Sequence, residues 1–303
     1  MKTVLVTGGA GFIGSHLVDA YLERGWRAVI IDDLSTGDRR NVNPRAELHV
    51  ADIGESAALV RDLRPDLVSH HAAQIDLRKS VVDPAADAET NIVSPIRLLQ
   101  ACVEAGVKRF VFASSGGAIY GDPVFAPQTE EHPERPMSPY GCAKLSFEHY
   151  INYYTIVYGL STVALRYANV YGPRQNSKGE AGVIAIFAGK MLRGEPVTIN
   201  GSGEQTRDFV FVRDVVAANM AVSERHDLTG AFNVGTGVET SVNALYELMK
   251  KTIGTSAPAQ HAPAKRGEQM RSVLDGEKLR KLAGLAPPRP LHDCIGETIG
   301  SFR

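Results

Sequence analysis

The segment from residue 3 to residue 14, TVLVTGGAGFIG, limits more than any other what this chain can fold into. Its first four residues form an apolar, β-branched run that is typical of a buried strand. The turn after them carries Gly9, Gly11 and Gly14 at the spacing that lets bare backbone approach a pyrophosphate at a helix N-terminus. A helical pattern follows to Arg24, and Ala28–Ile31 reads as a second strand. These elements predict a βαβ unit that binds a dinucleotide.

Asp32 stands at the end of the second predicted strand. A carboxylate at this place accepts hydrogen bonds from both ribose hydroxyls of a dinucleotide and repels a 2′-phosphate. NAD is therefore the expected cofactor rather than NADP. Arg39 and Arg40 follow closely, and their positive charge leaves NADP open as an alternative.

Short apolar strands continue to alternate with helical patterns through the first half of the chain. Strands are expected at 47–50, 67–70, 110–113 and 162–166, and helices at 56–63, 85–105 and 139–158. Pro95 lies inside the long helix and predicts a kink there. The alternation predicts an α/β fold in which residues 1–170 form a doubly wound parallel (Rossmann) sheet that binds NAD.

Beyond Tyr171 the alternation weakens, and loops rich in glycine, proline and charge increase. Helices are expected at 182–193, 214–223, 242–252 and 276–283, and short strands at 197–199 and 209–212. Residues 255–265, rich in alanine and proline, read as a loose loop. Residues 171–303 are therefore expected to form a smaller, partly interleaved α/β substrate domain, with some segments returning to the main sheet.

Composition and patterning argue against several kinds of partner. The net charge is -1 over 303 residues and both signs are interleaved, so no basic stripe for nucleic acid is present. No run approaches the roughly 18 apolar residues of a membrane span, and the chain begins in a strand pattern rather than a targeting segment. No membrane contact and a cytoplasmic location are expected. The three distant cysteines and the adjacent His70 and His71 lack ligand spacing, so no metal site is expected.

The segment SPYGCAKL, residues 138–145, is the candidate catalytic stretch. In a helix, Tyr140 and Lys144 lie at i and i+4 on one face, where an ammonium group can act on a phenol. A free tyrosine has a pKa near ~10, and a fixed cation beside it lowers that pKa and favours the phenolate. Because this spacing is also common on ordinary helices, the pair alone leaves a catalytic and a structural interpretation open.

Further motifs accompany this stretch, namely HHAAQ from His70, SSGGAIYG from Ser114 and RYANVYGPRQ from Arg166. Together with TGGAGFIG, Asp32 and YGCAK, they resemble the extended short-chain dehydrogenases/reductases, and most of all the UDP-glucose 4-epimerases and their NDP-sugar relatives. The resemblance implies that Tyr140 is the catalytic acid/base and that Lys144 also binds the nicotinamide ribose. It implies contacts with NAD from Gly8, Gly11, Phe12, Ile13, Gly14, Asp32, Asp33, Thr36, Gly37, Asp52, Ile53, His71, Ala72, Ala73, Asn91, Tyr140, Lys144 and Tyr167.

The segment SSGGAIYG also bears on the reaction class. Relatives place a Ser or Thr hydroxyl here, which hydrogen-bonds the sugar oxygen together with the tyrosine. An ungapped count puts Gly116 at that place, whereas a loop one residue shorter restores Ser115, which we expect to fill the role. The alternative is that Ser114 and Ser115 only bond local backbone. Related dehydratases and decarboxylases need carboxyl groups where this chain has Gly116, Gly117 and Ala118, which leaves hydride removal and return as the simplest chemistry.

The expected function is therefore that of a UDP-hexose 4-epimerase, acting on UDP-glucose and UDP-galactose by transient oxidation at carbon 4 with bound NAD. The alternatives are a related NDP-sugar dehydratase, decarboxylase or oxidoreductase and, outside enzymes, an NAD-sensing regulator. Relatives pair helices that correspond to 85–105 and 139–158 across a two-fold axis, so a homodimer is expected.

The resemblance also implies the residues that meet the UDP-sugar. They are Ser115, Tyr140, Asn169, Val183, Arg207, Lys265 and Arg266. Either Lys265 or Arg266 would hold the phosphates with Arg207, for which a surface ion pair with Asp208 is the other interpretation. Ser272 stands where some relatives carry a large aromatic residue, so UDP-N-acetylhexosamines are also expected to fit.

Overall fold

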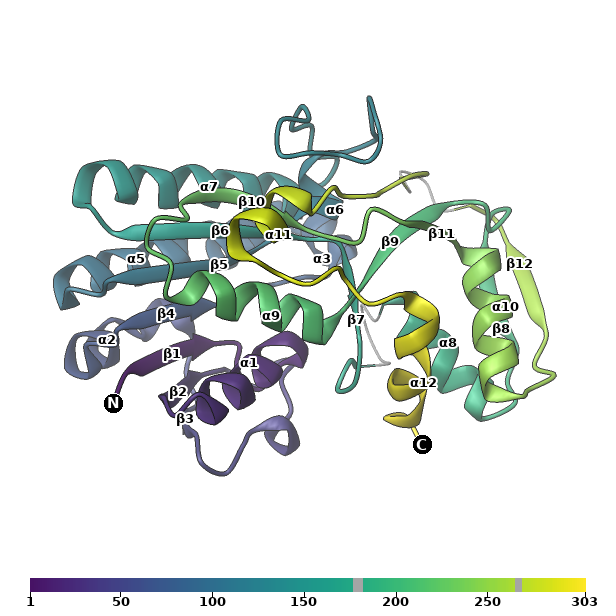
Figure 1. Cartoon of the computed structure of the whole chain (residues 1–303), viewed down its shortest axis with the longest axis horizontal. Coiled ribbons are helices and arrows are strands. Elements are labelled where there is room, and N and C mark those ends of the chain that lie inside the picture. The colour runs from purple at the N-terminus through teal and green to yellow at the C-terminus, as the bar shows by residue number, and fades with distance from the viewer. Residues whose placement is uncertain (177–181, 265–268) are drawn as a thin grey trace.

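The computed structural model describes residues 1–176, 182–264 and 269–303 (Figure 1). Seven parallel strands form the main sheet in the order β10-β6-β5-β4-β1-β2-β3. The strands are β1 Thr3–Thr7, β2 Arg27–Ile31, β3 Glu47–His49, β4 Leu67–His70, β5 Arg109–Ser115, β6 Ser161–Tyr167 and β10 Gly230–Val234. The α/β fold with a doubly wound parallel sheet is confirmed. Strand β10 was not predicted.

Helices cover both faces of this sheet (Figure 1). One face carries α1 Phe12–Glu23, α9 Val212–Ser223 and α11 Glu277–Ala283, and the other carries α2 Ala57–Leu63, α5 Ser94–Ala105 and α7 Pro139–Tyr158. Val6 and Ile30 pack in the core on the α1 side, whereas Leu5 and Val29 pack in the core beneath α5 and α7. Successive side chains of a strand point to opposite faces, so a sheet covered on both sides needs the continuous apolar runs that the sequence shows.

The strand order places a crevice at the carboxyl ends of β1 and β4. The chain runs outward from β1 to β3 and then crosses back to β4 on the other side of β1, and ligands of such sheets bind where the order reverses. The glycine turn after β1 and the segment after β4 meet there. His71 N donates to Thr7 O at 3.1 Å, and Ala72 N donates to Thr7 Oγ1 at 3.2 Å.

The helix predicted over 85–105, with a kink at Pro95, is interrupted just before that proline. Helix α4 Pro84–Ala88, a π-helical turn Glu89–Val93 and α5 follow one another directly. Pro95 lies in the first turn of α5. The wider hydrogen-bond pattern of the π turn before it accommodates the proline ring and the missing N–H.

The other elements form a smaller lobe at one end of the main sheet (Figure 1). It contains β7 Asn169–Tyr171, β8 Val197–Asn200, β9 Thr206–Phe211, β11 Glu239–Ser241, β12 Ala259–Ala262, α8 Val183–Leu192, α10 Val242–Ile253 and α12 Leu291–Gly300. Its sheets have the orders β11-β9-β7 and β12-β8. Phe187, Leu245 and Ile295 belong to its core. Strand β10 and helices α9 and α11 come from the same half of the chain but pack with the main sheet.

The loose loop expected at 255–265 is wrong for residues 259–262. Residues 259–262 form β12, which pairs in parallel with β8. The backbone of β8 supplies the partner, which a local composition rich in alanine and proline cannot reveal.

The remaining short elements lie near the crevice or on the edge of β2. They are α3 Leu77–Val82, α6 Gly116–Ile119 and the 3-10 turns Arg39–Asn41 and Ile53–Glu55. None of the helices within the described ranges is long and apolar enough to span a membrane.

Candidate active site

The turn between β1 and α1 packs so tightly that side chains are excluded from it. Gly8 has φ +69°, and a Cβ there would lie 2.7 Å from Ala72 N. A Cβ on Gly14 would lie 2.2 Å from Gly8 O. Helix α1 begins at Phe12 after Gly11, and no side chain in the described part of the chain caps its first N–H groups. A helix N-terminus with bare N–H groups is a favourable place for a phosphate.

Asp32 lies buried beside this turn, immediately after β2. Its Oδ2 accepts from Ala10 N and its Oδ1 accepts from Leu34 N, both at 2.9 Å. Gly37 lies against the same carboxylate, because a Cβ there would come 2.7 Å from Oδ1. These contacts fix the carboxylate, and its remaining lone pairs are available to ribose hydroxyls.

The other residues expected at the adenosine half lie along the same edge of the sheet. Asp33 and Thr36 are exposed in the loop after β2. Asp52 caps a 3-10 turn by accepting from Gly54 N at 2.7 Å, and Ile53 is buried in the core under α5.

Three residues expected at the cofactor direct their side chains into the protein. Phe12 and Ile13 pack against the core of the smaller lobe. The Tyr167 hydroxyl accepts from Asn219 Nδ2 at 2.7 Å in the interior. A contact between Tyr167 and a cofactor would therefore come from its backbone.

The segment after β4 is fixed to the π turn by an amide side chain. Asn91 accepts from Gln74 N at 3.1 Å and donates to Gln74 O at 2.9 Å. His71 stacks on Tyr167, with ring centroids 6.3 Å apart, and the half-buried Ala72 and Ala73 follow it. The structure thus brings Asn91 and residues 71–74 together at the crevice.

Tyr140, Lys144 and Ser115 meet at the carboxyl end of β5. Ser138 caps the start of α7 and Lys144 is buried against β5. The Ser115 side chain lies beside the Tyr140 hydroxyl, where hydrogen bonding from it lowers the pKa of the phenol. Lys144 Nζ lies 5.6 Å from the centroid of the Tyr140 ring and donates to Ala113 O at 3.1 Å.

Burial controls the pKa values of this pair. Desolvation raises the pKa of Tyr140 well above its usual value, the charge of Asp87 raises it further, and the hydrogen bond with Ser115 lowers it. Burial lowers the pKa of Lys144 to about 8, against the charges of Asp87 and Glu148, which raise it. The lowered Tyr140 pKa expected from the sequence is wrong for this structure, because burial of the phenol raises its pKa and only Ser115 lowers it.

The end of β5 decides which of the candidate residues lies beside Tyr140. A Cβ on Gly116 would lie 2.4 Å from Leu274 Cδ1, so a core side chain fills that direction. Ser114 points the other way and donates to Glu148 Oε1 at 2.5 Å. Of the three candidates, Ser115 is the residue that the structure brings to Tyr140.

Other motif residues hold α7 on the sheet. Glu148, one turn after Lys144, is buried and accepts from Arg166 Nε at 3.0 Å and from Nη2 at 2.5 Å. Arg166 of β6 also donates to the Tyr120 hydroxyl at 2.9 Å. The arginine of RYANVYG and the tyrosine of SSGGAIYG therefore fix the helix that carries Tyr140.

Gly117 opens toward the smaller lobe. A Cβ on Gly117 would have Ser272 Oγ at 3.8 Å and Asn169 Oδ1 at 4.0 Å as its nearest neighbours. Asn169 begins β7, and Ser272 is buried. Asn169 and Ser272, both expected at the UDP-sugar, therefore lie close together beside Gly117, two residues after Ser115.

Arg207 lies half-buried in β9, and its Nη1 donates to Thr206 O at 2.7 Å. The ion-pair interpretation required the neighbouring Asp208 to lie at the surface, but it does not. It is fully buried and accepts from Thr236 Oγ1 at 2.6 Å and from Leu274 N at 3.2 Å. Burial raises the pKa of Asp208 to about 6.

Of the three other residues expected at the substrate, the structure describes one. Val183 is the half-buried first residue of α8. Lys265 and Arg266 lie outside the described residues.

The histidines after β4 are neutral. His70 Nδ1 is bonded to Thr7 Oγ1 at 2.7 Å, and its ring stacks on Phe112. Burial lowers the pKa of His71 to about 3 and holds that of His70 well below its usual value. Within residues 1–176, 182–264 and 269–303, no group of three His, Cys, Asp or Glu side chains is placed to hold a metal ion.

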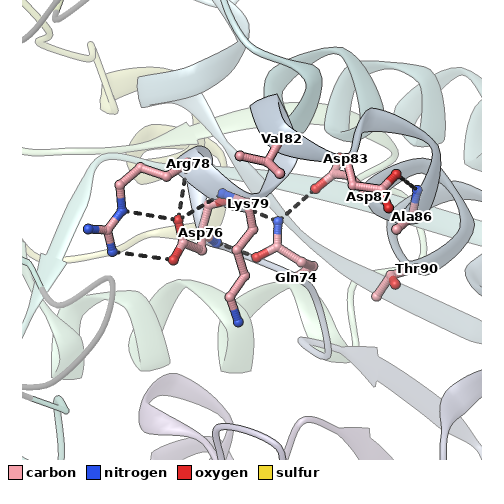
Figure 2. Close-up of a pocket in the computed structure, with 9 residues that line it drawn as sticks. All are labelled: Gln74, Asp76, Arg78, Lys79, Val82, Asp83, Ala86, Asp87 and Thr90. Atoms are coloured by element: carbon pink, nitrogen blue, oxygen red, sulfur yellow. Dashed lines mark hydrogen bonds and ion pairs between the residues drawn. The ribbon is translucent and has the colours of Figure 1, made fainter.

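Asp87 and the side chain of Gln74 are the site features that the sequence did not reveal. Asp87 Oδ1 accepts from Gln74 Nε2 at 2.9 Å and from Asn91 Nδ2 at 3.0 Å. Figure 2 shows Asp87 and Gln74 among the residues that line a hollow of about 510 Å³. The i,i+4 spacing of Asp87 and Asn91 in PAADAETN, on an otherwise alanine-rich turn, is the signal that could have found the acid.

Comparison with known proteins gives the family. The model of the NAD dependent epimerase/dehydratase family matches residues 4–235. The chain belongs to the NAD-dependent epimerase/dehydratase family.

Three solved structures are similar to this family member over nearly its whole length. The UDP-glucose 4-epimerase of Thermotoga maritima, solved with UDP-glucose, is 43% identical with a TM-score of 0.95, covering 99% of this chain and 98% of its own. That of Thermus thermophilus, solved with NAD, is 42% identical with a TM-score of 0.93 and covers 99% of both chains. The UDP-N-acetylglucosamine 4-epimerase of Methanobrevibacter ruminantium, in complex with UDP-N-acetylmuramic acid, is 34% identical with a TM-score of 0.93, covering 99% and 98%.

The geometry of this site fits NAD, the dinucleotide on which the family depends. Gly8 and Gly14 leave no side chain in the turn, so its bare backbone and the uncapped start of α1 form a cradle for a pyrophosphate. Asp32 lies at the ribose end of that cradle.

Proposed function

We propose that this protein is a UDP-hexose 4-epimerase that interconverts UDP-glucose and UDP-galactose with NAD as its cofactor. The observation that carries the proposal is the contact of Tyr140 with Ser115, beside buried Lys144, at the same sheet edge as the glycine turn. Gly116, Gly117 and Ala118 follow, without the acid and base that a second elimination step would need.

The residues that would hold NAD are those around the crevice. Gly8, Gly11 and Gly14 would receive the pyrophosphate, Asp32 the adenosine ribose, and Lys144 the nicotinamide ribose. Bound NAD supplies the hydride acceptor and, on return, the hydride donor at carbon 4 of the sugar.

Tyr140 moves the proton in this proposal. Its phenolate oxygen takes the proton of the sugar 4-hydroxyl, and Ser115 hydrogen-bonds the same sugar oxygen and so fixes its position. Because burial raises the pKa of Tyr140, the phenolate is a strong base once formed. The 4-keto sugar turns over at the site, so that the hydride would return to the opposite face of carbon 4, and Tyr140 returns the proton to the 4-oxygen.

The nucleotide end of the substrate is assigned to the smaller lobe. Asn169, the backbone at Val183, and Arg207 would contact the UDP-sugar, with Lys265 or Arg266 as a further cation. The planar guanidinium of Arg207 suits a diphosphate, because it makes paired, charge-assisted hydrogen bonds.

The proposed substrate range includes UDP-N-acetylhexosamines. Ser272 and Gly117 are small, and they lie together beside Asn169. The 34% identity to a UDP-N-acetylglucosamine 4-epimerase also supports the wider range.

A panel of UDP-sugars tests the function. Purified protein is incubated with each sugar without added cofactor, and products are identified by NMR. Equilibration of UDP-glucose with UDP-galactose is expected, with loss of at least ~10²-fold in rate for Tyr140→Phe, since general acid/base catalysis contributes that much. A stable keto product points to a lyase, stoichiometric NADH points to an oxidoreductase, and no turnover with retained NAD points to a regulator.

We also propose a homodimer, formed through α5 and α7. Helix α7 carries a row of exposed apolar side chains, which a partner of the same kind would cover. They are Tyr150, Tyr153, Ile156, Val157 and Tyr158. A cytoplasmic location stays a proposal that cell fractionation tests.

A further inference from the structure

Asp87 is a buried carboxylate that is only partly satisfied. It is 2% exposed, and its Oδ1 is held by Gln74 and Asn91. Its Oδ2 is buried and has no hydrogen-bond partner in the part of the chain that the structure describes. A buried carboxylate oxygen without a hydrogen-bond partner costs folding free energy, which calls for another role.

The position of Asp87 suggests that role. Helix α4, which carries Asp87, packs against α7, which carries Tyr140 and Lys144. Lys144 is 3% exposed, and its Nζ donates to the backbone carbonyl of Ala113. Because that carbonyl carries no net charge, this hydrogen bond does not neutralise the ammonium group. A buried ammonium group tends to lose its proton unless a fixed negative charge lies close by.

We propose that Asp87 is a positioning residue of the active site, whose carboxylate, fixed by Gln74 and Asn91, is the negative charge that keeps Lys144 protonated beside Tyr140. This proposal rests on the epimerase function proposed above. The charge of Asp87 raises the pKa of Lys144 and also that of Tyr140. The lysine thus stays a cation at neutral pH, and the phenolate becomes basic enough to hold a proton that it must later return.

Other charged groups around the pair have their own partners. From α7, Glu148 also raises the pKa of Lys144, but it is bound to Arg166. On the side of β4, His70 and His71 are neutral because burial lowers their pKa values.

The charged groups on the elements nearest Asp87 face outward or cap helices. Asp76 caps α3, and Lys79 lies in the same hollow as Asp87 (Figure 2). Asp83 caps α4 and is exposed, and Glu89 of the π turn pairs with Arg97 at the surface.

The first test measures the Lys144 ammonium directly and needs no activity. Lysine side chains are labelled with carbon-13, the Lys144 signal is assigned with Lys144→Arg, and its pKa is read from an NMR titration. The parent should titrate near about 8. In Asp87→Asn the pKa should fall by about one unit or more, as expected for the loss of a nearby charge.

Asp83→Asn is the matched control. It removes the same charge one helical turn earlier, at an exposed position where asparagine still caps α4. Its Lys144 pKa should stay within about 0.2 units of the parent value, because water and salt screen an exposed charge. Asp87→Glu, which keeps the charge, should restore most of the parent value.

The second test is the pH profile of kcat/KM. Both limbs should move to lower pH in Asp87→Asn, because the pKa values of Tyr140 and Lys144 fall together. An unchanged Lys144 pKa in a folded Asp87→Asn protein overturns the proposal, as does failure of both Asp87→Asn and Asp87→Ser to fold. If the parent lacks epimerase activity, the proposed function fails, and the lysine titration still decides whether Asp87 controls the Lys144 charge.

Discussion

At the residue scale, one step along β5 separates a serine that bonds Glu148 from a serine that lies beside Tyr140. Ser114 donates to Glu148, which belongs to the hydrogen-bond network that holds α7 on the sheet. The next residue, Ser115, lies beside Tyr140. Because successive side chains of a strand point to opposite faces, a serine cannot be exchanged between these roles by a shift of one residue.

Removal of the Ser115 hydroxyl should change both rate and pH dependence. Ser115→Ala is expected to lower kcat about 10²-fold, as the loss of one well-placed hydrogen bond in an active site does. The hydrogen bonding from Ser115 lowers the pKa of Tyr140, so its loss raises that pKa and moves the limb of the profile governed by Tyr140 to higher pH. Steady-state kinetics across pH with UDP-galactose measures both effects.

Ser114→Ala is the control for this pair. It should lower the free energy of unfolding by about 1–3 kcal/mol, because a buried charged acceptor loses a hydrogen bond. Its pH profile should keep its position. A larger pH shift in Ser114→Ala than in Ser115→Ala would reverse the assignment of the two hydroxyls.

At the scale of elements, the unit formed by β1, the turn and α1 requires a glycine, Gly14, inside the helix. A Cβ on Gly14 would lie 2.2 Å from Gly8 O, and the obstructing atom belongs to backbone. The turn cannot move aside without changing the cradle that would receive a pyrophosphate. Local helix propensity and tertiary packing therefore make opposite demands here.

Gly14→Ala should thus destabilise the protein by about 1–3 kcal/mol through overpacking and reduce its NAD content on purification. Gly296→Ala is the matched control, because Gly296 lies in α12 and no atom of the described residues comes within 4 Å of a Cβ placed on it. It should stabilise the protein by up to about 1 kcal/mol, since alanine favours helix. Urea unfolding and the absorbance of released cofactor measure the two quantities. Equal effects in both variants would refute the packing argument.

The bounds of helix α7 could be predicted from its own sequence. The predicted and observed bounds are the same, Pro139–Tyr158, because Ser138 caps the start, proline occupies the first turn and Gly159 ends the helix in the left-handed region. Strand β10 shows the opposite case. Its five residues pair with β6, which lies far away in the sequence, and no local signal announces that partner.

At the scale of the whole molecule, the unpartnered face of α7 is the feature with the clearest consequence. Ile156 is 74% exposed and Val157 is 56% exposed on a helix whose other face packs under the sheet. Large apolar side chains exposed together on one helix are costly in water unless a second surface covers them.

Sedimentation tests the proposed dimer. The parent should sediment as a dimer, and Ile156→Asp should shift it to monomer at micromolar concentration, because burying a charge in an apolar interface is costly. Val238→Asp is the control, since Val238 is 62% exposed but lies in the turn before β11. A parent monomer, or a dimer lost equally in both variants, would remove the assignment of the interface to α7.

We propose the division at residue 170 as the boundary between the cofactor and substrate parts of the chain. Strand β10 and helices α9 and α11 cross that boundary and complete the main sheet and one of its layers. The two parts are therefore expected to unfold together.

The amino-acid sequence by itself determined the βαβ start, the alternation of strands and helices, and the positions of Tyr140, Lys144 and Asp32, because each depends on residues close together in the chain. The tertiary structure decided three things that depend on distant residues. Contact with Leu274 excludes a side chain at Gly116 and leaves Ser115 as the hydroxyl at Tyr140. Burial, rather than i+4 spacing, controls the pKa values of the catalytic pair. The packing of α4 on α7 brings the charge of Asp87 to that pair, since electrostatic interactions follow distance in space and not separation in sequence.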